Sequence, residues 1–193
     1  MIGRLMHSIN EVTESGQAVH FPQAFLWGAA MSAHQVEGQN SHSDWWAWEQ
    51  AGRVNEQSGL TCDHYRRFRK DFDLAQQLHH NAHRFSVEWS RIEPEPGRWD
   101  EEAIAHYQEV IAALRERNLE PVVTLFHFTS PKWFSDQGSW QHPKAIEQFG
   151  RYVERVIEAL GSSVRFWITF NEPAIYVYQG YVAGAWPPGQ RSW

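Results

Sequence analysis

The stretch ITFNEP, residues 168–173, places an amide and a carboxylate directly after an apolar run. A short apolar run is typical of a buried strand, and Pro173 prevents the strand from continuing. Asn171 and Glu172 therefore stand where a strand delivers its last side chains. A carboxyl group in such a place can give and take protons in catalysis, whereas an ordinary surface glutamate is only solvated.

Three earlier apolar runs also end on side chains that form hydrogen bonds. The first leads into SAHQVEG with Gln35, the second carries Arg84 in RFSVEWS, and the third ends at His127 in TLFHFTS. Amides, an arginine, an imidazole and a carboxyl group can all bind hydroxyl groups, and the aromatic residues among them can stack on sugar rings. These types predict a carbohydrate site, provided that the strand ends meet.

Segments with helical periodicity separate these runs. In residues 100–118 apolar side chains recur every three or four positions, Asp100 is a natural N-cap, and the terminal charges match the helix dipole. Similar stripes predict helices at 63–78 and at 144–160, the last with Ile146 on its apolar face. The predicted strands are 25–31, 84–89, 122–127 and 164–170. This strand–helix alternation predicts an α/β fold with parallel strands.

The spacing of the strands indicates which α/β fold this is. Strands starting at residues 25, 84, 122 and 164 are about 46 residues apart on average. An eight-stranded (β/α)8 barrel at that pace needs about 370 residues, which is within the usual range of that fold. The 193 residues therefore correspond to about the first four βα units, a half-barrel. In such barrels the C-terminal strand ends form the mouth, where the candidate residues would meet.

Composition and small motifs exclude several other classes of function. The net charge of −6 and the lack of a basic block argue against a nucleic-acid partner. Cys62 is the only cysteine, so neither an intrachain disulfide nor a cysteine metal cluster is possible. No glycine-rich phosphate loop follows a strand, and we expect no cofactor. The segment LHHNAH holds His79 and His83, but it falls where a helix gives way to a strand, so we expect no metal.

The N-terminal residues 1–20 read as a polar arm. They contain no apolar run of signal-peptide length, and nowhere does the chain approach the roughly 18 apolar residues of a membrane span. We therefore expect a soluble, cytoplasmic protein that has no contact with a membrane.

Four stretches resemble the N-terminal half of glycoside hydrolase family 1. They are FLWGAAMSAHQVEG, HRFSVEWSRIEPEPGRWD, VVTLFHFTSPKWF and TFNEP, and they occur in the order of that family. The resemblance covers residues 21–193 and implies a (β/α)8 barrel and a retaining β-glycosidase, similar to β-glucosidases, that hydrolyses terminal β-linked sugars. The motif NEP alone is shared by a wider clan of barrel glycosidases that includes endoglucanases.

The resemblance also implies a role for each candidate residue. Glu172 matches the catalytic acid/base, and Asn171 matches the residue that holds the 2-hydroxyl of the sugar. Gln35 and His127 match residues that bind hydroxyls on the far side of the same ring, and Arg84 matches the arginine that orients the nucleophile. A purely structural role is the alternative for each of these side chains, and it is weightiest for Arg84.

The chain departs from the family in one respect that bears on catalysis. The family's nucleophile is a glutamate in a Thr/Ile-Glu-Asn-Gly motif, and no such motif occurs in these residues. We therefore expect no activity from this chain alone. It is a truncated enzyme, one chain of a split enzyme completed by a C-terminal half-barrel, or a half-barrel that self-associates. A non-catalytic carbohydrate-binding half-barrel is the alternative function. His34 and Phe128 replace a usual tyrosine and a frequent tryptophan.

Overall fold

The computed structural model describes residues 11–12 and 18–191. Four parallel strands form one sheet in chain order, β3-β4-β5-β6. Their bounds are β3 Gly28–Ala30, β4 Ala82–Ser86, β5 Glu120–Phe126 and β6 Phe166–Phe170. Two short strands, β1 (Glu11–Val12) and β2 (Ala18–Val19), pair with each other. The predicted parallel α/β fold is confirmed, whereas the predicted polar arm, residues 1–20, lies largely outside the described residues.

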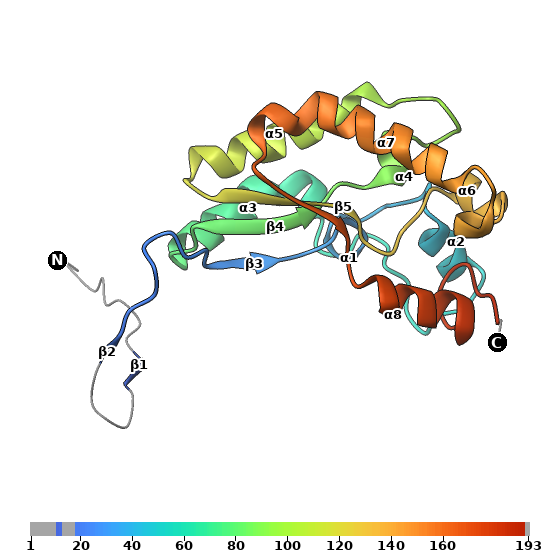
Figure 1. Ribbon diagram of the computed structural model, residues 1–193, viewed down its shortest axis with the longest axis horizontal. Coiled ribbons are helices and arrows are strands. Elements are labelled where there is room, and N and C mark those ends of the chain that lie inside the picture. The colour runs from blue at the N-terminus through green and yellow to red at the C-terminus, as the bar shows by residue number, and fades with distance from the viewer. Residues whose placement is uncertain (1–10, 13–17, 192–193) are drawn as a thin grey trace.

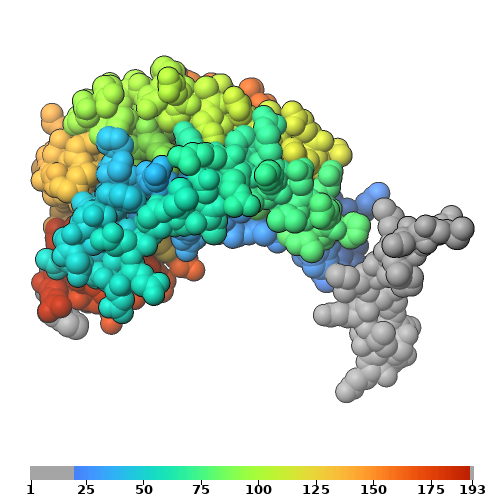
Figure 2. Space-filling view, turned by 180° about the vertical axis from the view of Figure 1, so that it is seen from behind, coloured from blue at the N-terminus to red at the C-terminus, as the bar shows by residue number. Residues whose placement is uncertain are grey.

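Three long helices connect the strands and cover one face of the sheet (Figure 1). They are α3 (His64–Gln77), α5 (Glu101–Glu116) and α7 (Ala145–Leu160). Seen from behind, α3 and α5 lie on the outer side of an arched molecule whose underside is hollowed (Figure 2). The helices therefore form the convex layer, and the sheet curves beneath them.

Short helices follow the C-terminal end of each strand. After β3 come α1 (Ala33–Val36) and α2 (Asp44–Gln50), after β4 comes α4 (Trp89–Ile92), and after β5 comes α6 (Lys132–Asp136). After β6 come α8 (Pro173–Val177) and a π-helix, η3 (Tyr178–Val182). Two 3-10 turns, η1 (Ser139–Gln141) and η2 (Gly161–Ser163), flank α7. The end of the sheet that carries the candidate residues is therefore the end with the most elaborate loops.

The signals read from the sequence of α5 are confirmed. The Asp100 carboxylate accepts a hydrogen bond of 3.0 Å from the amide of Ala103, which satisfies one of the free donors of the first turn. The apolar stripe of this helix is buried against the sheet, together with Val123 and Leu125 from β5. Phe85 of β4 belongs to the same core. Parallel strands that send alternate side chains into the helical layer leave the others for the opposite face.

The apolar stripe predicted for α7 does not coincide with its buried face. Ile146 is 83% exposed, because the buried face is set by Ala145, Tyr152, Val156 and Leu160. A residue next to Ala145 is rotated by about 100° around the helix axis and so faces solvent. The helix itself has the predicted location.

Both outer strands of the sheet have one unpaired edge among the described residues. Beside β3, the side chains of Phe21, Phe25 and Trp27 pack on one another with ring centroids 4.7–4.8 Å apart, yet each is 40% exposed. The predicted strand 25–31 is therefore shorter than expected, since its first residues form this cluster. Beyond β6, the apolar residues Ile175 and Val177 of α8 are also exposed. Open edges flanked by apolar surface are the expected features of a half-barrel.

The two histidines of LHHNAH lie in different environments. His79 has a positive φ of 59° just after α3, whereas His83 is buried in β4 with neither ring nitrogen hydrogen-bonded. They do not share a helical face, and the part of the chain that the structure describes holds no group of three or more residues placed to bind a metal. Nor does any described helix combine the length and apolar character needed to cross a bilayer. The cytoplasmic location stays a prediction.

The buried imidazole of His83 should make the fold sensitive to acid. Burial, together with the neighbouring His64 and His80, lowers the pKa of His83 from 6.5 to about 4. The unfolded chain therefore binds the proton first, so stability is lost as the pH falls from 6.5 to 4. The free energy of unfolding should therefore decrease between pH 8 and pH 5. Replacing His83 by Leu should make this decrease about 2 kcal/mol smaller, at about 1.4 kcal/mol per pKa unit. Urea unfolding at both pH values checks this, and parallel pH curves for parent and variant would contradict it.

Candidate active site

The C-terminal ends of the four strands are tied to one another by backbone hydrogen bonds. The amide of Met31 donates to Arg84 O at 3.0 Å, and the amide of Val87 donates to Thr124 O at 3.1 Å. At the last junction the amide of Asn171 donates to Phe126 O at 2.9 Å. These bonds continue the sheet past its regular strands and hold the loops after β3, β4, β5 and β6 at one rim.

Arg84 links three strands through its side chain. Its Nε donates to Thr124 Oγ1 at 2.9 Å, and its Nη2 donates to Asn171 Oδ1 at 2.6 Å. Asn171 is 9% exposed, so its oxygen is fixed in a buried position, whereas its Nδ2 group has no hydrogen-bond partner among the described residues. The structure thus brings Arg84 and Asn171 into direct contact. The side-chain NH2 group of Asn171 is left to donate to another molecule.

His127 lies close to the same arginine. Partial burial, together with the positive charge of Arg84, lowers the pKa of His127 from 6.5 to about 4. The imidazole is therefore neutral at neutral pH, with one nitrogen that donates and one that accepts. Its Nδ1 is buried without a partner in the described residues. Phe128, with a positive φ of 71°, turns the chain sharply after His127 and packs against Tyr176 and Trp186.

Glu172 stands directly after Asn171 and is exposed. Its φ is +41°, an uncommon conformation for a residue with a long side chain, and Pro173 follows as the first residue of α8. No hydrogen bond or ion pair joins its carboxyl group to another described residue, and it does not cap α8. The surrounding backbone therefore holds Glu172 in a strained conformation while leaving its carboxyl group free.

Gln35 is the least connected of the predicted residues. It is exposed on α1, and its Oε1 accepts a hydrogen bond of 2.7 Å from Ser32 Oγ. The amide of Ala33 donates to Ser86 Oγ at 2.8 Å, which fixes α1 to the end of β4. Among the described residues no hydrogen bond joins Gln35 to the other four candidates. Arg84 and Asn171 are in direct contact, the charge of Arg84 acts on His127, Glu172 follows Asn171 in the chain, and Gln35 lies on α1.

A buried network behind the rim was not foreseen from the sequence. The Glu37 carboxylate accepts 2.8 Å and 3.0 Å hydrogen bonds from Arg91 Nε and Tyr107 Oη. Burial raises the pKa of Glu37 to about 7, although the charge of Arg91 opposes this rise. The one signal in the sequence is Tyr107, because a tyrosine in an otherwise aliphatic helical stripe needs a polar partner.

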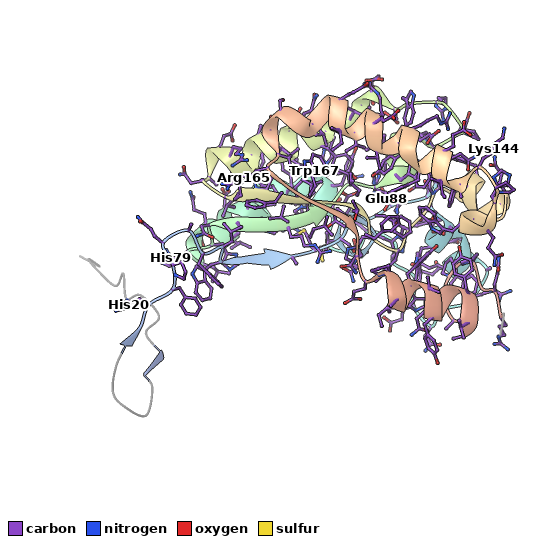
Figure 3. All side chains as sticks on the ribbon, in the orientation of Figure 1. His20, His79, Glu88, Lys144, Arg165 and Trp167 are labelled. Atoms are coloured by element: carbon purple, nitrogen blue, oxygen red, sulfur yellow. The ribbon has the colours of Figure 1, made fainter. Side chains whose placement is uncertain are left out.

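Glu88 lies in the interior at the end of β4 (Figure 3). Its carboxylate accepts hydrogen bonds from the Ser90 amide at 3.2 Å and from Thr129 Oγ1 at 2.8 Å. Since Thr129 follows two residues after His127, Glu88 joins the ends of β4 and β5. These bonds explain the position of Glu88 without any part in catalysis.

His34, where the family usually has tyrosine, has partners of its own. Asn40 Nδ2 lies 3.3 Å from His34 Nδ1, and His34 Nε2 lies 2.9 Å from Glu49 Oε1. Because an amide nitrogen only donates, Nδ1 accepts and Nε2 carries the proton. The ring also lies 6.0 Å from that of Trp45. His34 is thus held in place by Glu49, so an ordered aromatic side chain stands where the family usually has tyrosine.

The closeness of Arg84 and His127 can be tested in solution. Replacing Arg84 by Met removes the positive charge that helps to lower the pKa of His127, so this pKa should rise part of the way from about 4 toward 6.5. Histidine side-chain NMR measures the titration directly. Arg165, an exposed residue near the other end of the sheet from Glu88 (Figure 3), gives the matched control Arg165→Met, which should leave His127 unchanged. Equal effects of both variants would contradict the arrangement.

Comparison with known proteins places this architecture. The model of the family described as glycosyl hydrolase family 1 matches residues 17–193. Beta-glucosidase 25 of Oryza sativa subsp. japonica is 35% identical over 198 residues, which cover 97% of this chain and 40% of that protein. Beta-glucosidase A of Thermotoga maritima is 34% identical over 180 residues, covering 89% of this chain and 40% of that protein.

Solved structures agree with this match. The β-glycosidase from Pyrococcus horikoshii superimposes with a TM-score of 0.86 at 44% identity, covering 89% of this chain and 40% of that one. The chain therefore spans about 40% of the length of the relatives that it matches. Its four parallel strands form part of a (β/α)8 barrel, as predicted. By sequence and by fold, this chain belongs to glycosyl hydrolase family 1.

Proposed function

We propose that this chain supplies the acid/base half of a retaining β-glycosidase that hydrolyses terminal β-linked sugars. The observation that carries the proposal is the geometry at the end of β6. There Glu172 presents a free carboxyl group, and the adjacent Asn171 is fixed by a 2.6 Å hydrogen bond from Arg84. The names of the relatives, β-glucosidases from rice and Thermotoga maritima, support the same class of substrate.

Glu172 acts twice in the proposed reaction. It first protonates the departing glycosidic oxygen, and it then removes a proton from the water that hydrolyses the glycosyl-enzyme. Retention of configuration needs a second carboxylate, the nucleophile, about 5–5.5 Å away. These 193 residues contain no Thr/Ile-Glu-Asn-Gly motif to provide it.

Arg84 has donors left for that nucleophile. A guanidinium group has five N–H donors. The hydrogen bonds to Thr124 and Asn171 occupy Nε and one N–H of Nη2, so both N–H groups of Nη1 are free to orient an incoming carboxylate. Arg84 can therefore have both a structural and a catalytic role. Its Nε and Nη2 atoms hold the strand ends together, and its Nη1 atom can bind the nucleophile.

The sugar ligands are proposed on the same grounds. The free Nδ2 group of Asn171 can donate to the 2-hydroxyl of the sugar next to Glu172. The neutral imidazole of His127 can both donate and accept, which suits a hydroxyl group better than an imidazolium would. Gln35 donates through Nε2, since its Oε1 is held by Ser32.

The nucleophile must come from a C-terminal half-barrel, whether in the same polypeptide or in another. Such a half would pair with the free edges of β3 and β6 and would cover the exposed side chains of Phe21, Phe25 and Trp27. Self-association of this chain would cover the same surfaces. It would, however, bring a second Glu172 rather than a dedicated nucleophile, so we propose the C-terminal half as the productive partner.

Alone, the 193-residue chain should release no measurable nitrophenol from a nitrophenyl β-glucoside. The physical reason is that no second carboxylate forms the glycosyl-enzyme. Continuous absorbance measurement at high protein concentration checks this. Robust turnover by the chain alone, lost in Glu172→Gln, would show that the nucleophile lies within these residues.

Complementation tests the positive half of the proposal. The chain should gain hydrolytic activity when mixed or co-expressed with the remaining C-terminal portion of Thermotoga maritima beta-glucosidase A. Glu172→Gln should lower this activity at least about 100-fold, the usual contribution of general acid/base catalysis. Glu147→Gln, at an exposed site on α7, is the matched control and should leave the activity unchanged. Activity that survives Glu172→Gln would refute the assigned acid/base.

A carbohydrate-binding half-barrel without catalysis is the second candidate. It is favoured by the donors of Asn171 and His127, which are already assembled without the nucleophile. Calorimetric titration of the isolated chain with glucose or gluconolactone should then give heat at millimolar ligand, and Asn171→Ala should abolish it. Absence of heat at that concentration rejects this candidate and leaves the enzyme proposal intact.

A further inference from the structure

Asp44, the first residue of α2, is clamped to the loop that follows His127. Its amide donates to Ser130 O at 2.8 Å, and the amide of Ser130 donates to Asp44 Oδ1 at 3.0 Å. Close by, the amide of Lys132 donates to His42 O at 2.7 Å. This clamp fixes the segment between β5 and α6 against the start of α2.

The second carboxyl oxygen of Asp44 has no partner. Asp44 is 4% exposed, and Oδ2 is buried without a hydrogen bond. No salt bridge reaches Asp44 from the described residues, and the titratable groups that face it are the carboxyl group of Glu88 and the phenol of Tyr176. An ionised carboxylate here would be a buried charge without a compensating cation, which is strongly unfavourable.

Two buried hydroxyl groups beside Asp44 are also unpaired. Ser130 Oγ, in the residue that Asp44 clamps, has no hydrogen-bond partner. Tyr176 Oη is likewise buried without a hydrogen-bond partner among the described residues. Neither hydroxyl group donates to Oδ2, so a negative charge on that buried oxygen would have no hydrogen-bond donor to stabilise it. Burial, moreover, raises the pKa of Asp44 to about 8, although the amide of Ser130 opposes this.

We propose that Asp44 is a positioning residue: as a neutral carboxylic acid it fixes the β5–α6 loop, and through that loop the imidazole of His127. The same loop also packs against α8, because the ring of Phe128 lies 6.2 Å from that of Tyr176, whose amide donates to Glu172 O at 3.1 Å. The loop that Asp44 clamps thus connects His127 to the helix of Glu172. Only the sugar-binding role of His127 rests on the proposed function, whereas the clamp and its protonation state do not.

The substitutions Asp44→Asn and Asp44→Ala separate the two protonation states. Asparagine keeps the Oδ1 acceptor for Ser130 and replaces the acid proton by an amide donor, so amide hydrogen exchange of residues 128–132 should stay within about twofold of the parent at pH 6. Alanine leaves the buried Ser130 amide unpaired, and exchange there should accelerate about tenfold. If the alanine variant does not fold, the comparison of asparagine with the parent decides alone.

The pH dependence gives an independent readout. A carboxyl group whose pKa is about 8 in the fold and 3.8 as the reference value stabilises the fold while it is protonated, and this stabilisation is lost as the pH rises from 4 to 8. The stability of the parent relative to that of Asp44→Asn should therefore fall as the pH rises over this range. Infrared spectra at pH 6 should also show a protonated carboxyl band in the parent that is reduced in Asp44→Asn.

The proposal has a control and clear contrary outcomes. Asp136 is an exposed aspartate in an ion pair with Lys132 of α6, so Asp136→Asn tests loss of a carboxylate in the same region and should change neither readout. Loosening of the loop by Asp44→Asn as severe as by alanine would overturn the proposal. So would an infrared band or a pH slope equal in parent and Asp44→Asn. None of these measurements requires hydrolysis, so failure of the glycosidase proposal would be recognised separately.

Discussion

The guanidinium group of Arg84 holds the ends of three parallel strands in one arrangement. It leaves β4, reaches Thr124 on β5 and continues to Asn171 at the end of β6. A planar fork of donors fixes direction as well as distance, so Asn171 is oriented and not merely held nearby. The same positive charge adds to the effect of burial in lowering the pKa of His127, and the position of Glu172 follows from that of Asn171. Arg84 thus adds a side-chain link to the backbone hydrogen bonds that already hold these loops at one rim.

The elements that depend on local sequence could be predicted. The cap at Asp100 and the apolar stripe of α5 are signals that depend only on residues close together in the sequence. The strands could likewise be recognised as short apolar runs. Errors arose where tertiary packing decides. Ile146 continued an apolar stripe but faces solvent, since Ala145 and Tyr152 set the buried side. The strand predicted from residue 25 begins only at Gly28, because Phe25 and Trp27 pack on each other instead.

The candidate site also has one part that could be predicted from the sequence and one part that could not. Its residue types could be read from the strand ends, since parallel topology sends those ends to one rim wherever the strands lie in the sequence. The groups behind the rim could not. Glu37 and Asp44 are bonded to Tyr107 and Ser130, partners 70 and 86 positions away, and nothing in the neighbouring sequence marks these acids as buried. Their raised pKa values and the lowered one of His127 have a common cause, namely burial that disfavours charge of either sign.

Burial also connects the open edges of the sheet to the proposed chemistry. A general acid has to carry its proton at the working pH, and enzymes secure this by an apolar environment or by a nearby negative charge. In this chain Glu172 is exposed, and the described residues offer it no carboxylate partner. A C-terminal half that covered β3 and β6 would also cover the mouth and bring the nucleophile next to Glu172. Under the proposed function, closing the barrel is therefore one event with two consequences: it hides apolar surface, and it creates the environment in which Glu172 can act as an acid.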